Sequence, residues 1–176
     1  MRPITGRLAI ALRRPGGTPL LVRRARNAVL QSGAEMLAAL FRGEAGAAPT
    51  GFAVGLDDSP PGPPFAAAPL TITRPDGSPG IVRPAAALAA DAMSVATIAD
   101  ELLVRVTVRG VLPADAATSP DGPDAQVAVA EAALGVLAAD GLSLSRIYNR
   151  VVFEPVPKTA AHELALFWEI DFPYGA

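Results

Sequence analysis

One segment decides the fold class of this chain: Glu101–Arg109, which reads ELLVRVTVR. Its even-numbered positions are all aliphatic, whereas most of its odd-numbered positions carry charged or polar side chains. This alternation with a period of two indicates a β-strand with one buried face and one face in water. Because antiparallel sheets commonly keep one face solvated, the segment favours an antiparallel sheet.

The strand-like segment Glu163–Phe172, ELALFWEIDF, repeats this alternation near the end of the chain. Large apolar side chains occupy every even-numbered position from 164 to 172, and the acidic side chains lie at odd-numbered positions. Trp168 is the single tryptophan and belongs to the apolar face. Because aromatic side chains remove a large apolar area from water, we expect Trp168, Phe153 and Phe172 to anchor the core.

Shorter patterns predict further strands and turns. Two apolar runs flank the turn sequence Pro15–Gly17 and predict an N-terminal hairpin over residues 6–26. Other strands are expected at residues 51–56, 70–73 and 147–153, with residues 154–159 as an extended connector and residues 126–137 as either a strand or a helix. Residues 57–69 and 113–123 are rich in proline and turn-forming side chains and are expected to be surface loops.

One helical pattern stands out, at residues 30–42, where apolar side chains recur at helical spacing. Ser32 followed by Glu35 matches a capping box, Gly43 stands where a helix C′ residue is favoured, and Asn27 is an alternative start. We therefore expect a mainly β (β-rich α+β) fold in a single domain, residues 1–176. It is an antiparallel, sandwich-like domain with this helix packed on it, a basic hairpin at 6–26 and a strand-rich body at 51–172.

Composition excludes several classes of protein. The chain of 176 residues has 51% apolar residues, enough for a core, and it has no cysteine, which excludes disulfides, thiolate nucleophiles and cysteine-based metal sites. The apolar run before Arg13 and Arg14 is too short for a signal peptide, and the longest uncharged run carries several prolines. We expect no membrane span and a protein that is made and folded in the cytoplasm.

Charge is unevenly distributed along the chain. Seven arginines and no acid precede Glu35, so this part carries +7 while the remainder carries −9. Three interpretations remain open: a solvated hairpin that neutralises acids of the same fold, a subunit interface, or contact with nucleic acid. The last is disfavoured because no aromatic side chains are interleaved with the arginines and the isoelectric point is near 5.4. The candidate partner interface consists of Arg13, Arg14, Arg23, Arg24 and Arg26.

The sequence offers little for catalysis. His162 is the single histidine, no Gly-x-Ser-x-Gly elbow accompanies it, and it is best interpreted as a surface turn residue. No glycine-rich phosphate-binding loop is present. The carboxylate clusters are Asp57–Asp58, Asp100–Glu101 and Asp121/Asp124. The first and the last lie in Pro/Gly loops, where acids are typical turn residues, and the last lacks the spacing of a calcium loop. We therefore predict no catalytic, cofactor-binding or metal-binding residues and no small-molecule substrate.

Several segments resemble a pattern in tail, baseplate or fibre-associated structural proteins of bacteriophages and related contractile injection particles. They are residues 26–43 followed by 51–55, then 131–136, 148–159 and 163–172. In that pattern a strand with a Glu-Ala-(Gly/Ala)-Leu core precedes an Asn/Ala-Arg-x-x-Phe strand, a proline–lysine connector and a closing strand that carries tryptophan. Asn149, Arg150 and Lys158 match it, and we expect Arg150 to pair with an acid across the sheet.

The resemblance implies a non-enzymatic building block whose role is to form interfaces with copies of itself or with other particle subunits. A +7 segment and a −9 remainder are complementary head to tail, and heterologous contacts of that kind close into rings. An alternative is a free-standing binding module that holds an acidic ligand or partner with the basic hairpin or the Pro/Gly loops. A third hypothesis is a hydrolase whose acids come from separate loops.

Overall fold

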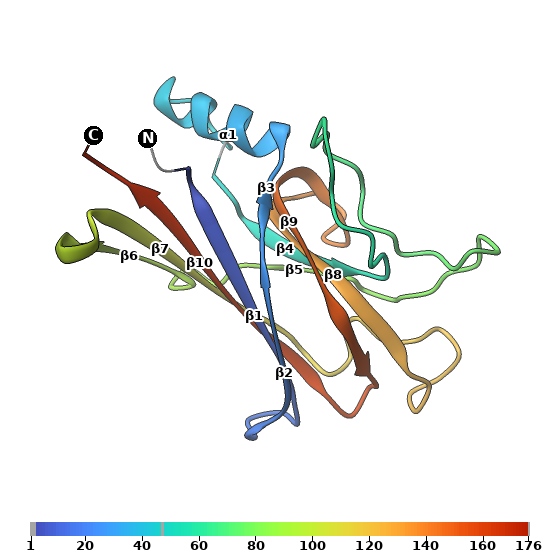
Figure 1. Ribbon diagram of the computed structural model, residues 1–176. Helices are drawn as coiled ribbons and strands as arrows, with labels where there is room; N and C mark the ends of the chain where they lie inside the picture. Colours follow the sequence, from blue (N-terminus) through green and yellow to red (C-terminus); the bar gives the residue numbers. More distant parts are fainter. Residues whose placement is uncertain (1–2, 47, 176) are drawn as a thin grey trace.

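Two antiparallel sheets of five strands each pack face to face in the computed structural model, which describes residues 3–46 and 48–175 (Figure 1). Sheet A has the order β2 (Pro19–Arg26), β1 (Thr5–Arg13), β10 (Glu163–Pro173), β7 (Leu103–Leu112) and β6 (Met93–Ile98). Sheet B has the order β3 (Ala28–Val29), β9 (Leu144–Lys158), β8 (Val127–Leu137), β4 (Gly51–Gly55) and β5 (Ala85–Ala87). The helical segments are α1 (Gln31–Phe41) and the short 3-10 turn η1 (Ala99–Glu101). The predicted β-rich, sandwich-like fold with one α-helix is confirmed.

The N-terminal hairpin is held in sheet A by the last strand of the chain. Strand β1 pairs with β2 on one side and with β10 on the other, in a register that runs from Thr5↔Asp171 to Arg13↔Glu163. After β2 the chain passes through Asn27 directly into β3, which belongs to sheet B. The predicted hairpin over residues 6–26 is therefore confirmed, and it also connects the two sheets.

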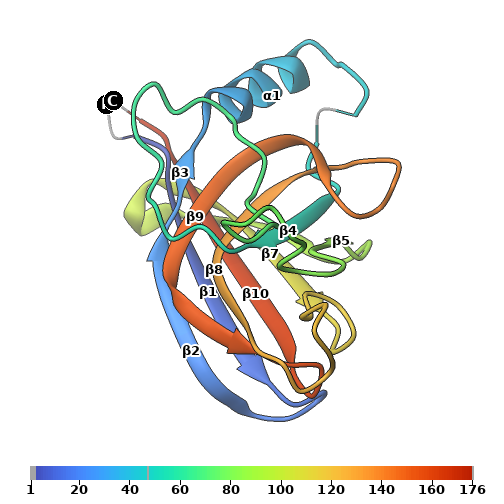
Figure 2. The same ribbon diagram turned by 90° about the vertical axis from the view of Figure 1, so that its right-hand side faces the viewer.

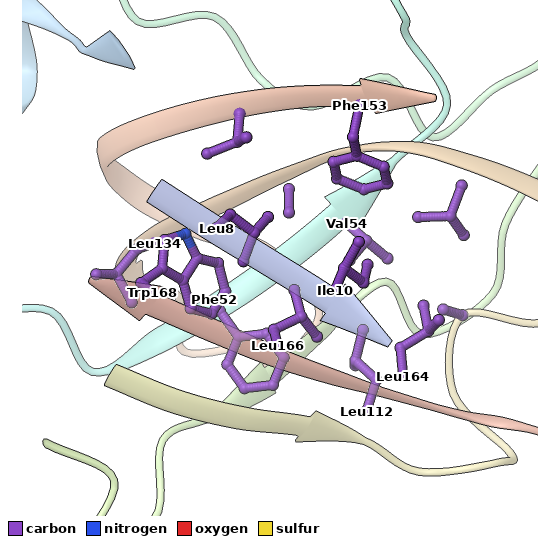
Figure 3. Close-up of a cluster of buried hydrophobic side chains, with 14 of the residues drawn as sticks. Leu8, Ile10, Phe52, Val54, Leu112, Leu134, Phe153, Leu164, Leu166 and Trp168 are labelled. Carbon is purple, nitrogen blue, oxygen red and sulfur yellow. The ribbon is translucent and has the colours of Figure 1, made fainter. Parts of the chain in front are cut away.

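The core lies between the two sheets and is centred on an aromatic pair (Figure 3). Trp168 of β10 is fully buried and packs edge to face on Phe52 of β4, with ring centroids 5.9 Å apart. Gly110 of β7 makes room for this contact, because a Cβ atom there would lie 2.6 Å from the Phe52 ring. Phe153 is also buried, whereas Phe172 is only partly buried at one end of the core.

Helix α1 lies across one end of the sandwich, and the long segment 56–84 covers the outer face of sheet B (Figure 2). Helix α1 packs closely on β9, since a Cβ atom at Gly33 would lie 2.0 Å from the Tyr148 carbonyl oxygen. Leu30 and Leu70 pack there against Ile147 and form a second, smaller apolar cluster. None of the described helices has both the length and the apolar composition that a membrane crossing requires.

Two predictions about strands are wrong. Residues 70–73 do not form a strand: only Thr73 makes an isolated bridge, and the Thr71 amide donates to a side chain instead of a neighbouring strand. The strand at 147–153 and the connector at 154–159 form one continuous strand, β9. Its prolines are tolerated because β3 pairs only with Asn149 and Arg150, which leaves the second half of β9 at an edge of the sheet.

Two further differences concern short segments. The strand predicted at 101–109 begins later, at Leu103, because residues 99–101 form η1, and the ambiguous segment 126–137 is a strand, β8. The edge strand β6 was not predicted, because its sequence MSVATI has no charged residue to mark an alternation.

The predicted capping box is also wrong. Helix α1 has Leu30 at its N-cap position, and the Ser32 hydroxyl donates to the Ile147 carbonyl of β9. Glu35 accepts a hydrogen bond from the Gln31 side chain at 2.9 Å. The alternative helix start at Asn27 is excluded because residues 28 and 29 pair with β9. Gly43 does adopt the predicted left-handed conformation after the helix, with φ +71°.

The burial of Trp168 leads to a stability prediction. Replacing Trp168 by Ala removes a fully buried ring from the contact between the sheets, so the free energy of unfolding is expected to fall by about 3–5 kcal/mol. Phe41→Ala is a matched control, since it removes an aromatic ring that is 95% exposed and is expected to change stability by less than about 0.5 kcal/mol. Urea unfolding measures both, and a loss below about 1 kcal/mol for Trp168→Ala would contradict this description of the core.

Candidate interaction surfaces

Part of the basic N-terminal segment is neutralised within sheet A. Arg7 pairs with Glu169 of β10 at 3.3 Å, and Arg13 pairs with Glu163 at 2.7 Å. Both pairs join residues directly opposite each other in the register between β1 and β10, where opposite charges stabilise a sheet. Arg105 of β7 continues the same row of charges on the outer face of sheet A.

The remaining arginines of this segment differ in their contacts. Arg23 is half-buried and pairs with Glu154 of β9 at 3.0 Å, so it joins β2 to sheet B. Arg14, Arg24 and Arg26 are exposed and have no ion-pair partner within residues 3–46 and 48–175, and Arg2 lies outside the described residues. Of the five predicted interface residues, two are therefore engaged within the fold and three remain available to a partner.

Arg24 and Arg26 border a shallow depression on the outer face of sheet A. Arg7 and Phe167 also line it, and its volume is about 350 Å³. Glu169 also lines the depression, where it pairs with Arg7, whereas Arg24 and Arg26 form no ion pair within the described residues and give the depression a positive rim. The depression is thus a candidate site for an acidic group.

A groove with an almost entirely apolar lining lies where the sandwich opens beside α1. Its inner part, about 150 Å³, lies between α1 and the inner faces of both sheets, and its outer part, about 500 Å³, opens to solvent. We call it the apolar groove. The residues of the outer part are Ile4, Leu37, Leu40, Phe41 and Phe172. Strand β1 begins and β10 ends at this same end of the molecule (Figures 1 and 2).

Phe41 is the most exposed large apolar side chain of the groove, with 95% of its surface in contact with solvent. Leu40 is 45% exposed and Ile4 is 40% exposed. Contiguous apolar surface of this kind marks a site of interaction with another protein or with another apolar partner. Phe41 falls within the apolar helical pattern of residues 30–42, and such a pattern does not show whether another element covers its ring.

A buried charge cluster lies beneath the segment 56–84. Glu131 of β8 is fully buried and accepts a hydrogen bond from Arg150 of β9 at 2.6 Å. Its other carboxylate oxygen accepts the Thr71 amide at 2.7 Å, while Arg150 also donates to Asp57 at 2.8 Å. The prediction that Arg150 pairs with an acid across the sheet is confirmed. Hydrogen bonds from Ser59, together with Arg150, lower the pKa of Asp57 below its usual value.

The other polar residues that carry the family resemblance are also buried. The Asn149 side chain accepts a hydrogen bond from the Leu134 amide at 3.2 Å. Lys158 is fully buried at the end of β9, and its ammonium group donates to the carbonyl oxygens of Ala114 and Thr159 at 3.0 and 3.3 Å. Burial lowers the pKa of Lys158 to about 8. These residues hold β9 against its neighbours and are not accessible to a partner.

The residues considered for catalysis do not converge. His162 bonds to the Thr159 hydroxyl at 3.0 Å, Asp57 belongs to the charge cluster, and Asp121 pairs with Arg74. Asp100 and Glu101 form the short turn η1, and they are exposed. Within the part of the chain that the structure describes, no three histidine, aspartate or glutamate side chains gather in a way that could hold a metal ion.

Comparisons of this chain with protein-family models, with curated proteins and with solved structures find no match. The surfaces themselves therefore supply the basis for a functional proposal.

The charge cluster leads to a second stability prediction. Glu131→Ala leaves Arg150 in the interior without its main partner, so the free energy of unfolding is expected to fall by about 3–5 kcal/mol. Glu44→Ala breaks the exposed pair with Arg42 and is expected to cost less than about 1 kcal/mol. Both are measured by urea unfolding, and equal losses in the two variants would show that the cluster does not tie the segment 56–84 to sheet B.

Lys158 leads to a prediction about pH. Between pH 8 and 10.5 the folded chain releases the Lys158 proton while the unfolded chain keeps it, so the unfolded state binds more protons and stability rises with pH. We expect the free energy of unfolding to rise by about 2 kcal/mol from pH 8 to pH 10. The Lys158→Met variant is expected to lack this rise. Denaturant unfolding at both pH values tests this, and a flat profile for the unmodified chain would refute it.

Proposed function

We propose that this chain is a non-enzymatic structural component of a phage tail or phage-tail-like contractile injection particle, and that it acts through subunit–subunit interfaces. The observation that carries the proposal is the apolar groove. Its outer lining, which includes Phe41 and Leu40, is apolar and open to solvent, and subunit association would remove this surface from water.

The polar residues of the chain support a structural role. Glu131, Arg150 and Lys158 are buried and bond to neighbouring strands and loops, and His162 bonds to the loop that precedes β10. These side chains stabilise the sandwich from within. The resemblance to tail, baseplate and fibre-associated proteins supplies the class of particle, with the chain made in the cytoplasm and then assembled into the virion or injection particle.

A second candidate function is a free-standing binding module for an acidic ligand. The observation that favours it is the depression bordered by Arg24 and Arg26, whose charges have no acidic partner among the described residues. The two functions differ in solution. A monomer that binds polyphosphate with an affinity that falls as salt rises would favour the binding module.

The proposed function is tested in cells that produce the particle. Particles are sedimented from a strain that expresses either the unmodified chain or Phe41→Glu, and the chain is quantified by immunoblot. We expect the unmodified chain in the particles and roughly tenfold less of the variant, because a charge at the groove would oppose burial in an interface.

The control is Leu142→Glu, which adds the same charge at a side chain that is 48% exposed and lies in the turn between β8 and β9. It is expected to enter particles normally, and both purified variants are expected to keep the unfolding free energy of the parent within about 0.5 kcal/mol. Absence of the unmodified chain from sedimented particles would exclude the proposed function.

A further inference from the structure

The two edge strands of sheet A, β2 and β6, differ in chemical character. No described strand pairs with β2 on the side away from β1, and none pairs with β6 on the side away from β7. An open edge presents unpaired backbone N–H and C=O groups, and proteins commonly protect such edges with charge or proline. Residues 93–97 of β6 are exposed, and the whole strand contains neither charge nor proline.

The outward-facing backbone groups can be assigned from the ladders. The Arg109 amide donates to the Ala92 carbonyl, so alternate residues from Ser94 onward face β7, and Val95 directs its N–H and C=O away from the sheet. The Asn27 amide donates to the Gly6 carbonyl, which by the same alternation directs the backbone of Val22 away from β1. Both edges therefore have backbone groups without a partner strand, and β9 lies beside β2, where Arg23 pairs with Glu154.

The exposed side chains of the two edges are complementary. Strand β2 has an apolar first half, in which Leu20 is 59% exposed, and its second half carries Arg24 and Arg26. Strand β6 is apolar or small throughout, with Val95 69% exposed, and it leads into the exposed acids Asp100 and Glu101 of η1.

The direction of the strands aligns these halves. Every neighbouring pair from β2 through β1, β10 and β7 to β6 is antiparallel, so β2 and β6 run in the same direction. If β6 of one copy lies beside β2 of the next in a continuous sheet, the apolar halves come together. The acids after β6 then come close to Arg24 and Arg26 of the neighbouring copy.

Self-pairing of either edge is less favourable. An antiparallel pair of β2 strands would place Arg24 and Arg26 of each copy opposite the apolar half of the other copy, where no acid pairs with them. An antiparallel pair of β6 strands would place Asp91 of one copy near Asp100 of the other. Like charges opposite each other destabilise a sheet. The contact that satisfies both edges is therefore heterologous, and a repeated heterologous contact produces a ring or a filament.

We propose that copies of this chain assemble head to tail by parallel pairing of β6 of one copy with β2 of the next, with Asp100 and Glu101 opposite Arg24 and Arg26. This inference rests on the proposed function, because it names the interface through which the structural component would join its own copies.

The test uses charge reversal at each edge of the full chain. Variant X carries Arg24→Glu and Arg26→Glu, and variant Y carries Asp100→Arg and Glu101→Arg. Light scattering after size exclusion at low salt is expected to show an oligomer for the unmodified chain and monomers for X and for Y. An equimolar mixture of X and Y is expected to recover the oligomer, because each of the two alternating contacts is then complementary.

Two further variants keep the test specific. Val95→Pro removes an outward N–H on an edge strand, where proline is tolerated, and is expected to give a monomer with a thermal midpoint close to that of the parent. The double variant Arg42→Glu and Arg83→Glu changes the net charge as X does, at exposed arginines away from both edges, and is expected to keep the oligomer.

The outcomes separate this inference from the proposed function. A monomeric unmodified chain at low salt would overturn the edge pairing, while the particle sedimentation would still decide the proposed function. An oligomer that persists in X, in Y and in Val95→Pro would support assembly and overturn this interface. Monomeric X and Y that do not recover the oligomer when mixed would overturn the charge pairing.

Discussion

The contact between Trp168 and Phe52 is the constraint on which the rest of the structure depends, because it joins β10, the central strand of sheet A, to β4, a fully buried strand of sheet B. Aromatics make up only 5% of the chain, and many of the other buried side chains are alanine. A buried alanine removes much less apolar area from water than a buried aromatic ring. The chain therefore relies on a few large side chains at the centre and on close backbone approach elsewhere. Gly110 leaves room for the Phe52 ring because it has no Cβ atom, and for the same reason Gly33 lets the backbone of α1 come close to β9.

The predictable part of the fold is the part with strong local periodicity. The segments that became β7 and β10, the hairpin before Arg26, and α1 were all recognisable because their apolar residues repeat with the period of a strand or a helix. The predictions were wrong for segments whose conformation depends on residues far away in the sequence. Residues 70–73 looked like a strand, but a buried carboxylate from β8 accepts the amide of Thr71.

The candidate surfaces were predictable only in part, for a related reason. The arginines of the N-terminal segment were visible as a charge imbalance, but the sequence could not show that Arg13 and Arg23 meet acids more than a hundred residues away. The apolar groove was not predictable, because Phe41 belongs to a helical apolar pattern whether or not another element covers it. The edge strand β6 has no periodic signal, although its lack of charge becomes informative once it is known to be an edge.

The pairing of β1 with β10 has a consequence for the order of events during synthesis. Thr5 lies opposite Asp171, so sheet A cannot be completed until the residues of β10 have left the ribosome. Contacts between such distant residues form slowly, because the intervening chain must first be closed into a loop. Strand β2 is held in sheet A through β1, and β6 is joined to β1 and β2 only through β7 and β10. The two hairpins β1–β2 and β6–β7, which carry the open edges, therefore belong to one sheet only after β10 has paired with both.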